Sequence, residues 1–171
     1  MKLINKNGFT LVELVLVIGI IAVLFSVALA VLDPLGQIQK ANDVRRKSDL
    51  SQTQKALETY YQDKGRYPRT NGSPNYCMQD TTTSTTYCGG SIWAPYMNLV
   101  PKDPNSSNRY VYYTPSDGQS YYIYANLERG SKDPQTCSGG ACTSPSGSGM
   151  NMNTACTKVC NFGFSSPNVT P

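Results

Sequence analysis

Three residues near the start of the chain could take part in backbone cleavage and charge pairing: Gly8, Phe9 and Glu13. Gly8 has no Cβ, so a protease can approach its backbone closely. Cleavage after Gly8 would leave a cationic amine on Phe9, one helical turn from Glu13 and on the same helix face. An acid costs about 2.5–3.5 kcal/mol at the centre of an apolar membrane helix. We therefore expect Glu13 to have a partner, and the obvious one is the Phe9 amine of a neighbouring copy.

The six cysteines are the second group of reactive residues, and all of them follow residue 76. An even number in a loop-rich segment outside the membrane predicts three disulfides, for which fifteen pairings exist. Cys77 and Cys88 are expected to pair, because they are remote from the other four and enclose one loop. The rest are expected to hold a tail, from residue 134 on, that lacks apolar residues of its own. These four are Cys137, Cys142, Cys156 and Cys160. Two alternatives stay open: a four-thiolate metal site, for which the spacings are loose, and free thiols.

Histidine is absent from the 171 residues. This excludes Ser-His-Asp triads, Cys-His dyads and His-ligated zinc, and it removes the usual general base near neutral pH. Since the sequence contains no other catalytic constellation, we expect a protein that is not an enzyme. No cofactor is assigned.

The element that positions Glu13 is an apolar run of 24 residues, from Phe9 to Leu32. As a helix it would span roughly 36 Å, which is enough to cross a bilayer core of about 30 Å. Lys2 and Lys6 precede it and would stay on the cytoplasmic side. Three interpretations compete: a secretory signal peptide cut after Ala30, a plain single-span anchor, and a leader cut after Gly8. The first two give Glu13 no role, so the third is favoured.

The segment Lys6-Asn7-Gly8-Phe9-Thr10-Leu11-Val12-Glu13-Leu14 supports the third interpretation. It resembles the processing signal of type IV prepilins and type II secretion pseudopilins. The resemblance implies cleavage between Gly8 and Phe9 and N-methylation of Phe9 by a prepilin peptidase/N-methyltransferase. It also implies single-pass storage in the bacterial inner membrane, followed by assembly into a homo-oligomeric filament in the periplasm or at the cell surface. An inner-membrane assembly platform and an ATPase are further implied partners.

Beyond the apolar run, the sequence predicts a helical stalk and a small head. Pro34 interrupts the apolar pattern, helical propensity resumes up to about Lys64, and Gly65 can form the C-cap. Gly19 and Pro34 enclose a stretch that resembles the part of the stem that loses helical structure in assembled pili. We expect an α+β, pilin-like lollipop with a leader (1–8), a transmembrane or filament-core helix (9–33), an amphipathic stalk helix (34–66) and a globular head (67–171).

Within the head, residues 72–90 are expected to form a loop. Residues 109–114 and 120–127 are expected to pair as an antiparallel hairpin around a turn at residues 115–118. This tyrosine-rich hairpin and the preceding Val100-Pro101-Lys102-Asp103-Pro104 resemble the C-terminal region of type II secretion major pseudopilins. That family often holds a calcium ion near this sheet. The carboxylates here are too sparse to assign ligands, so calcium stays open.

The net charge of +4 arises between residues 36 and 70, where eight Lys and Arg oppose four Asp and Glu. Such an excess favours an anionic membrane surface or nucleic acid, although a solvated helix face with i,i+4 ion pairs explains it more simply. We expect a structural subunit of a type IV pilus or pilus-like filament. One alternative is the major pseudopilin of a type II secretion system. Another, from a different class, is a membrane-tethered binding or redox module, and DNA binding through the basic stalk is a further hypothesis.

Overall fold

The computed structural model describes residues 8–72 and 75–171. The chain divides into two compact units, Met1–Ile38 and Gln39–Pro171. The basic residues expected in the leader, Lys2 and Lys6, lie outside the described residues.

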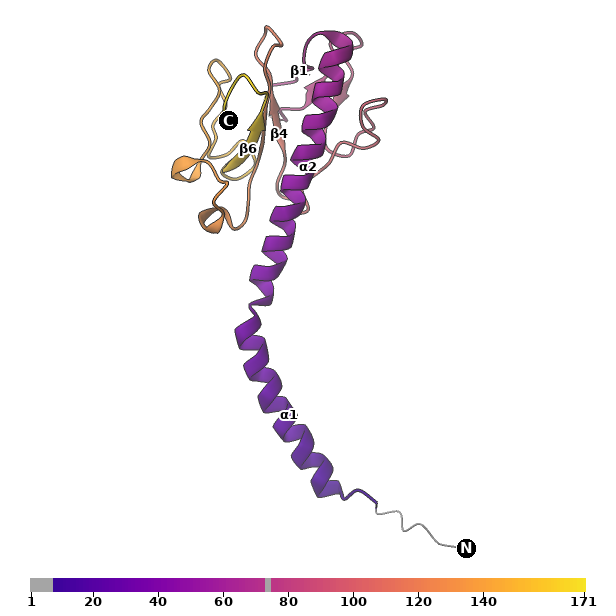
Figure 1. Cartoon of the computed structure of the whole chain (residues 1–171), viewed down its shortest axis with the longest axis vertical. Coiled ribbons are helices and arrows are strands. Elements are labelled where there is room, and N and C mark those ends of the chain that lie inside the picture. Colours follow the sequence, from indigo (N-terminus) through magenta and orange to yellow (C-terminus); the bar gives the residue numbers. More distant parts are fainter. Residues whose placement is uncertain (1–7, 73–74) are drawn as a thin grey trace, which may run out of the picture. The chain divides into compact units, whose positions relative to one another are not determined.

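The first unit contains helix α1, Leu11–Leu32 (Figure 1). Its segment Leu11–Leu29 has a mean hydropathy of 2.9 and is long enough to cross a membrane. The helix runs through Gly19 without interruption and ends at Asp33, whose φ of 40° is left-handed. Pro34 then begins the next helix, because proline has no N–H with which to continue α1. The break expected at Pro34 is therefore present, while the loss of helix between Gly19 and Pro34 in a filament stays a prediction.

Helix α2 spans Pro34–Lys64. It stops where Gly65 takes a φ of 69°, and the Gly65 N–H donates to the Tyr61 carbonyl at 2.8 Å. A left-handed glycine is a common end for a helix, since it avoids the Cβ clash of other residues. The predicted end of the stalk helix near Lys64, with Gly65 as its C-cap, is thus confirmed.

One stripe of α2 forms part of the core of the second unit. Leu50, Leu57 and Tyr60 are almost fully buried, at spacings that place them on one helix face. Ile38 and Val44, which lie nearer the start of α2, are 58% and 60% exposed. The buried stripe therefore begins at Leu50 and not at the start of α2.

The main sheet has three antiparallel strands in the order β4-β5-β6. β4 is Val111–Tyr113, β5 is Tyr122–Ala125 and β6 is Phe162–Ser165. The expected hairpin is present as β4 and β5, with Tyr112 opposite Ile123. Strand β6 comes from the cysteine-rich tail, where no strand was expected, and it pairs with β5 so that Phe164 lies opposite Ile123.

Two strands of a second, smaller sheet lie in residues 72–90, which were expected to be a loop. Its strands are β1 Arg69–Thr70, β2 Met78–Gln79 and β3 Thr86–Tyr87, in the order β1-β2-β3. These strands are only two residues long, too short for a period-2 pattern to show in the sequence. Two 3-10 turns complete the regular structure, η1 Gly130–Lys132 and η2 Ser138–Gly140.

The main sheet is buried on both faces. One face packs with α2 in a cluster that includes Leu57, Tyr121, Ile123, Leu127 and Phe162. The other face packs with the tail, whose loops are drawn from orange to yellow in Figure 1. The second cluster combines strand residues with tail residues: Val111, Tyr124, Cys142, Met150, Met152, Ala155, Cys156 and Cys160.

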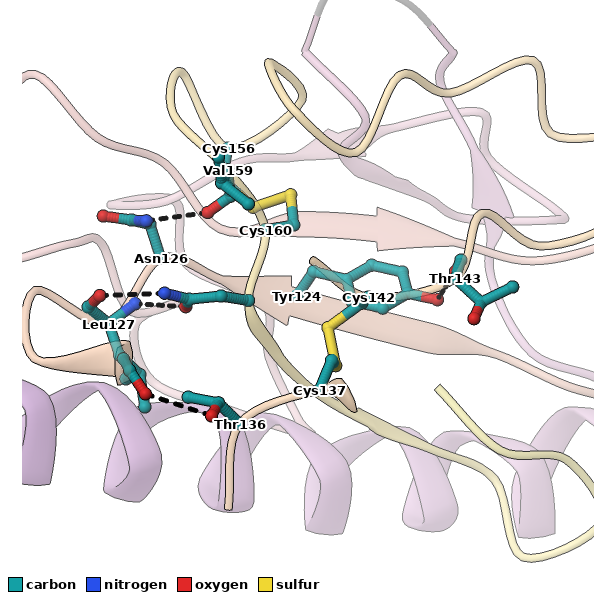
Figure 2. Close-up of a disulfide and its surroundings, with 12 residues drawn as sticks. Tyr124, Asn126, Leu127, Thr136, Cys137, Cys142, Thr143, Cys156, Val159 and Cys160 are labelled. Atoms are coloured by element: carbon teal, nitrogen blue, oxygen red, sulfur yellow. Dashed lines mark hydrogen bonds between the residues drawn. A yellow bond between two sulfur atoms is a disulfide. The ribbon is translucent and has the colours of Figure 1, made fainter. Parts of the chain in front are cut away.

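The expectation of a tail without its own apolar residues is therefore wrong. Met150, Met152 and Phe162 are each at least 94% buried. Figure 2 shows that polar contacts join the tail to β5 as well: the Tyr124 hydroxyl donates to the Thr143 carbonyl at 3.2 Å. Asn126, directly after β5, donates through its amide to the Val159 carbonyl at 2.7 Å. The tail is consequently a layer of the head and not a stapled appendage.

The buried tyrosines predict how the head responds to alkali. Burial raises the pKa of Tyr110, Tyr112, Tyr121 and Tyr124 above the usual value. Because the folded pKa exceeds the unfolded one, the stability from these hydroxyls is complete below a pH of about 10 and is lost as the pH rises toward the folded pKa. Absorbance at tyrosinate wavelengths should therefore rise in two phases, the second coinciding with loss of near-ultraviolet circular dichroism.

The control for the alkaline titration is the same chain in guanidinium chloride, where all 12 tyrosines should ionise in one step. A single step in the folded protein, near the ordinary tyrosine pKa, would contradict the buried arrangement.

Candidate functional site

The Gly8–Glu13 segment forms the start of α1, and its geometry centres on the Glu13 carboxylate. Thr10 is the N-cap residue, and its hydroxyl accepts a hydrogen bond from the Glu13 N–H at 3.2 Å. In return, Glu13 Oε2 accepts from the Thr10 N–H at 2.9 Å and from the Thr10 hydroxyl at 2.8 Å. The two residues thus form a reciprocal capping box, which satisfies N–H groups that a helix start leaves without partners.

This geometry gives Glu13 a partner within its own chain. Before cleavage, the nitrogen of Phe9 belongs to a peptide bond and carries no charge, so it cannot pair with the carboxylate. The Phe9 side chain is 80% exposed. Glu13 is therefore held by Thr10 in the single chain, and a charge pair with a cleaved Phe9 amine would have to replace or supplement that contact.

Sequence reasoning identified Gly8, Phe9 and Glu13 but missed the role of Thr10 as the N-cap of α1. A signal was present, because Thr followed three residues later by Glu, directly before an apolar run, is the sequence pattern of a capping box. The motif was interpreted as a processing signal alone, although the same residues also specify where α1 begins.

The capping box predicts a measurable difference between two substitutions at Thr10. Thr10→Val removes the hydroxyl and should weaken the helix start by about 1 kcal/mol, which is roughly a fivefold gain in local opening. Thr10→Ser keeps the hydroxyl and serves as the matched control. Amide hydrogen exchange of Val12 and Glu13 in detergent micelles should be faster in the valine variant only, and equal rates in all three proteins would contradict the cap.

The six cysteines form three disulfides. Cys77 pairs with Cys88 across the small sheet, because the two residues flank the paired positions Met78 and Tyr87. The other two bridges are short-range, Cys137–Cys142 and Cys156–Cys160, and both lie beside β5 (Figure 2). No described cysteine between residues 75 and 171 is a free thiol. The sulfur atoms are thus engaged in cross-links, and the four-thiolate alternative does not match these pairs.

A second polar site lies in the head, where the Arg46 cluster joins α2 to two distant loops. We define this cluster as Arg46, Asp43, Asp103 and Glu128. The Arg46 side chain is fully buried, and its guanidinium contacts Asp103 through Nε and Nη2, both at 2.8 Å. It also contacts Asp43 and Glu128, again at 2.8 Å. Burial alone would lower the pKa of Arg46, but the three carboxylates raise it above its ordinary value.

Lys47, the next residue of α2, binds a third segment of the head. Its ammonium donates to Asp133 Oδ2 at 2.6 Å and to Gln135 Oε1 at 2.7 Å. It also lies 5.5 Å from the centre of the Phe162 ring, within range of a cation–π contact. Partial burial would raise the pKa of Asp133, but hydrogen bonds from Lys47 and from the Gln135 N–H lower it overall.

Sequence reasoning placed Arg46 and Lys47 in a basic, solvated helix face, and the structure corrects that interpretation for both. Arg46 is buried and Lys47 is bound by the head. The (i, i+3) pairing of Asp43 with Arg46 was visible in the sequence, but its partners 57 and 82 residues away were not. Such long-range pairs leave no periodic signal.

The calcium ion suggested by the family resemblance was tested against the carboxylates present. Among residues 8–72 and 75–171, no group of three or more His, Cys, Asp or Glu side chains is arranged to hold a metal ion. The carboxylates that do converge, in the Arg46 cluster, direct their oxygens at N–H groups. Calcium requires six to eight oxygen ligands at about 2.3–2.6 Å. The described residues therefore do not fit a calcium site.

These features define the class of the protein. A cleavage-type motif at Gly8–Glu13, an apolar helix able to span a membrane, and an antiparallel sheet with disulfides make this an α+β, pilin-like protein. Residues 3–29 match the family described as prokaryotic N-terminal methylation motif. Residues 34–142 match the family described as type II secretion system (T2SS), protein G. The chain belongs to this type II secretion system protein G family.

Relatives agree with this assignment. The chain is 31% identical to type II secretion system core protein G of Escherichia coli K12 over 135 residues, which cover 77% of this chain and 90% of the relative. It is 30% identical to the core protein G of Vibrio cholerae serotype O1 over 118 residues, covering 68% and 76%. The core protein G of Aeromonas hydrophila is 31% identical over 103 residues, covering 58% and 68%. No solved structure matches the chain.

Proposed function

We propose that this chain is the major pseudopilin of a type II secretion system, a structural subunit and not an enzyme. The observation that carries the proposal is the match of α2 and most of the head, residues 34–142, to the protein G family. The methylation motif over residues 3–29 supports processing at Gly8–Phe9. The sequence alone favoured a type IV pilus, and the relatives favour the pseudopilin alternative instead.

The proposed mechanism is assembly through α1. A prepilin peptidase on the cytoplasmic side cleaves after Gly8 and N-methylates Phe9, while α1 holds the subunit in the inner membrane. An assembly platform and its ATPase then move subunits into a periplasmic filament. The cationic amine of Phe9 in one subunit pairs with Glu13 of the next.

This charge pair would set the stagger between subunits. In an apolar filament core a mis-staggered subunit leaves both charges buried without partners, at a cost of about 3–5 kcal/mol. The capping box supports the proposal, because it keeps the Glu13 carboxylate satisfied until the amine exists.

Two other hypotheses have less support. DNA binding relied on the basic excess of α2, but Arg46 is buried and Lys47 is paired with Asp133. A redox or metal-binding module relied on reactive thiols, but the six cysteines are present as disulfides.

Glu13→Gln tests the assembly mechanism, because it separates the charge from the cap. Glutamine also completes a capping box, so α1 should begin normally, but the neutral side chain cannot pair with the Phe9 amine. Mass spectrometry of envelope and filament fractions should find chains that begin at Phe9 for both proteins. Filament yield should fall by more than about 100-fold in the variant, since the amine is left unpaired.

The matched control is Asp33→Asn, which removes a negative charge elsewhere in the first unit and keeps the oxygen that accepts from Gly36. It should assemble normally. Equal filament yield from Glu13→Gln and wild type would overturn the charge-pair mechanism. In the native host, deletion of the chain should abolish protein export to the medium; unchanged export with loss of surface pili would instead favour the type IV pilus.

The oxidised state of the cysteines is tested by alkylating the native protein without reductant and measuring its intact mass. We expect no label, because the 6 cysteines form 3 disulfides. The same protein after reduction in denaturant is the control and should gain six labels. Labelling of the native protein, or co-purified metal, would restore the redox or metal-binding hypothesis.

A further inference from the structure

Two consecutive cations of α2 have a role that the filament function does not explain. Arg46 and Lys47 are held by oxygen atoms from different loops of the head. We propose that Arg46 and Lys47 are the resident cations that close the head loops onto α2, so that the head needs no divalent metal ion to fold. This inference concerns the second unit alone and holds whether or not the chain forms a secretion filament.

The first argument is the orientation of the acidic groups in the Arg46 cluster. Asp103 uses both oxygens on Arg46, and its Oδ1 also accepts from the Asn105 N–H at 2.8 Å. Asp43 accepts from Arg46 and from the backbone N–H groups of Glu128 and Arg129, at 2.8 and 2.9 Å. Together with Glu128 Oε1, five of the six carboxylate oxygens accept from N–H groups.

The second argument is what a metal ion would have to displace. The Arg46 guanidinium makes four hydrogen bonds of 2.8 Å to the three carboxylates. Its planar fork matches the two oxygens of Asp103, a geometry that an arginine provides and a point charge does not. The side chain is fully buried, so no solvent competes for these bonds. A calcium ion could reach the same oxygens only by expelling the guanidinium.

The third argument is the position of Lys47. Its ammonium has a carboxylate from Asp133, an amide oxygen from Gln135 and the ring face of Phe162 around it. This set of groups surrounds a compact cation with two oxygens and an aromatic face. The ammonium thus supplies the positive charge for a loop that lies 86 residues further along the chain.

Both cations act on loops that connect the regular elements of the head. Asp103 precedes β4, Glu128 follows β5, and Asp133 lies after η1. One turn of α2 therefore fixes the connection before β4 at one point and the connection from β5 to β6 at two points, one on each side of η1. Removal of one partner from a buried ion pair is strongly unfavourable, because it leaves the other charge without compensation.

The test uses the full chain in detergent micelles, with thermal unfolding followed by near-ultraviolet circular dichroism. Wild type is measured in millimolar CaCl2 and in EDTA. Lys47→Gln removes one resident cation, and Lys55→Gln is the matched control, because Lys55 is an exposed lysine of the same helix. Arg46→Gln removes the other cation. A ligand that binds only the folded state raises the unfolding midpoint, so calcium binding would be visible directly.

We expect the same wild-type midpoint in calcium and in EDTA. Lys47→Gln should unfold several degrees below Lys55→Gln, and Arg46→Gln about 10 °C or more below wild type. If Arg46→Gln fails to fold, the difference in unfolding midpoint between Lys47→Gln and Lys55→Gln tests the proposal on its own. A wild-type midpoint that rises in calcium would overturn the proposal, and so would equal midpoints for the two lysine variants.

Discussion

The head depends on the buried Arg46 guanidinium. Its three carboxylate partners come from α2 itself, from the loop before β4 and from the loop after β5. A charge of this kind tolerates few alternative arrangements, since any shift of a loop leaves a buried carboxylate or guanidinium without a partner. Apolar packing would accept small displacements more readily. The register between α2 and the sheet is therefore set by the Arg46 cluster, around which the apolar core packs.

The main sheet, whose position this register sets, is covered on both faces by segments of the same chain. The α2 side uses Leu57 and Ile123, and the tail side uses Val111, Tyr124 and Met152. A three-stranded sheet of strands three or four residues long offers little area for either layer. Short-range disulfides in the tail compensate, because they limit the conformations of the unfolded tail and leave the packed layer less entropy to lose. The tyrosines also stabilise these layers, because each one buries its ring and its hydroxyl can still bind a polar group.

The sequence allowed the elements with strong local signals to be predicted, together with the three disulfides and the Cys77–Cys88 pair. The apolar run, the break at Pro34, the end of α2 near Gly65 and the β4–β5 hairpin each follow from periodicity or from a residue with restricted backbone geometry. Strand β6 was missed because Phe162–Ser165 lies in a Gly-, Ser- and Asn-rich tail and acquires its conformation from pairing with β5. The Arg46 cluster was missed because an arginine on a polar helix looks the same in the sequence whether its partners are water or carboxylates 57 and 82 residues away.

Arg46 and Glu13 are both charged groups that need an opposite charge nearby when they are buried. The two sites differ in when that opposite charge becomes available. Arg46 is neutralised during folding, by groups that are already part of its own chain. Among residues 8–72 and 75–171, Glu13 is held by the Thr10 N–H and hydroxyl, and those groups carry no charge to offset its own. A neutral cap suffices where the carboxylate stays near water or a membrane edge, but an apolar filament core would demand a cation. Under the proposed assembly, a motif that both caps a helix and follows the cleaved bond would make burial of Glu13 conditional on cleavage, because the amine that could neutralise the carboxylate exists only after cleavage.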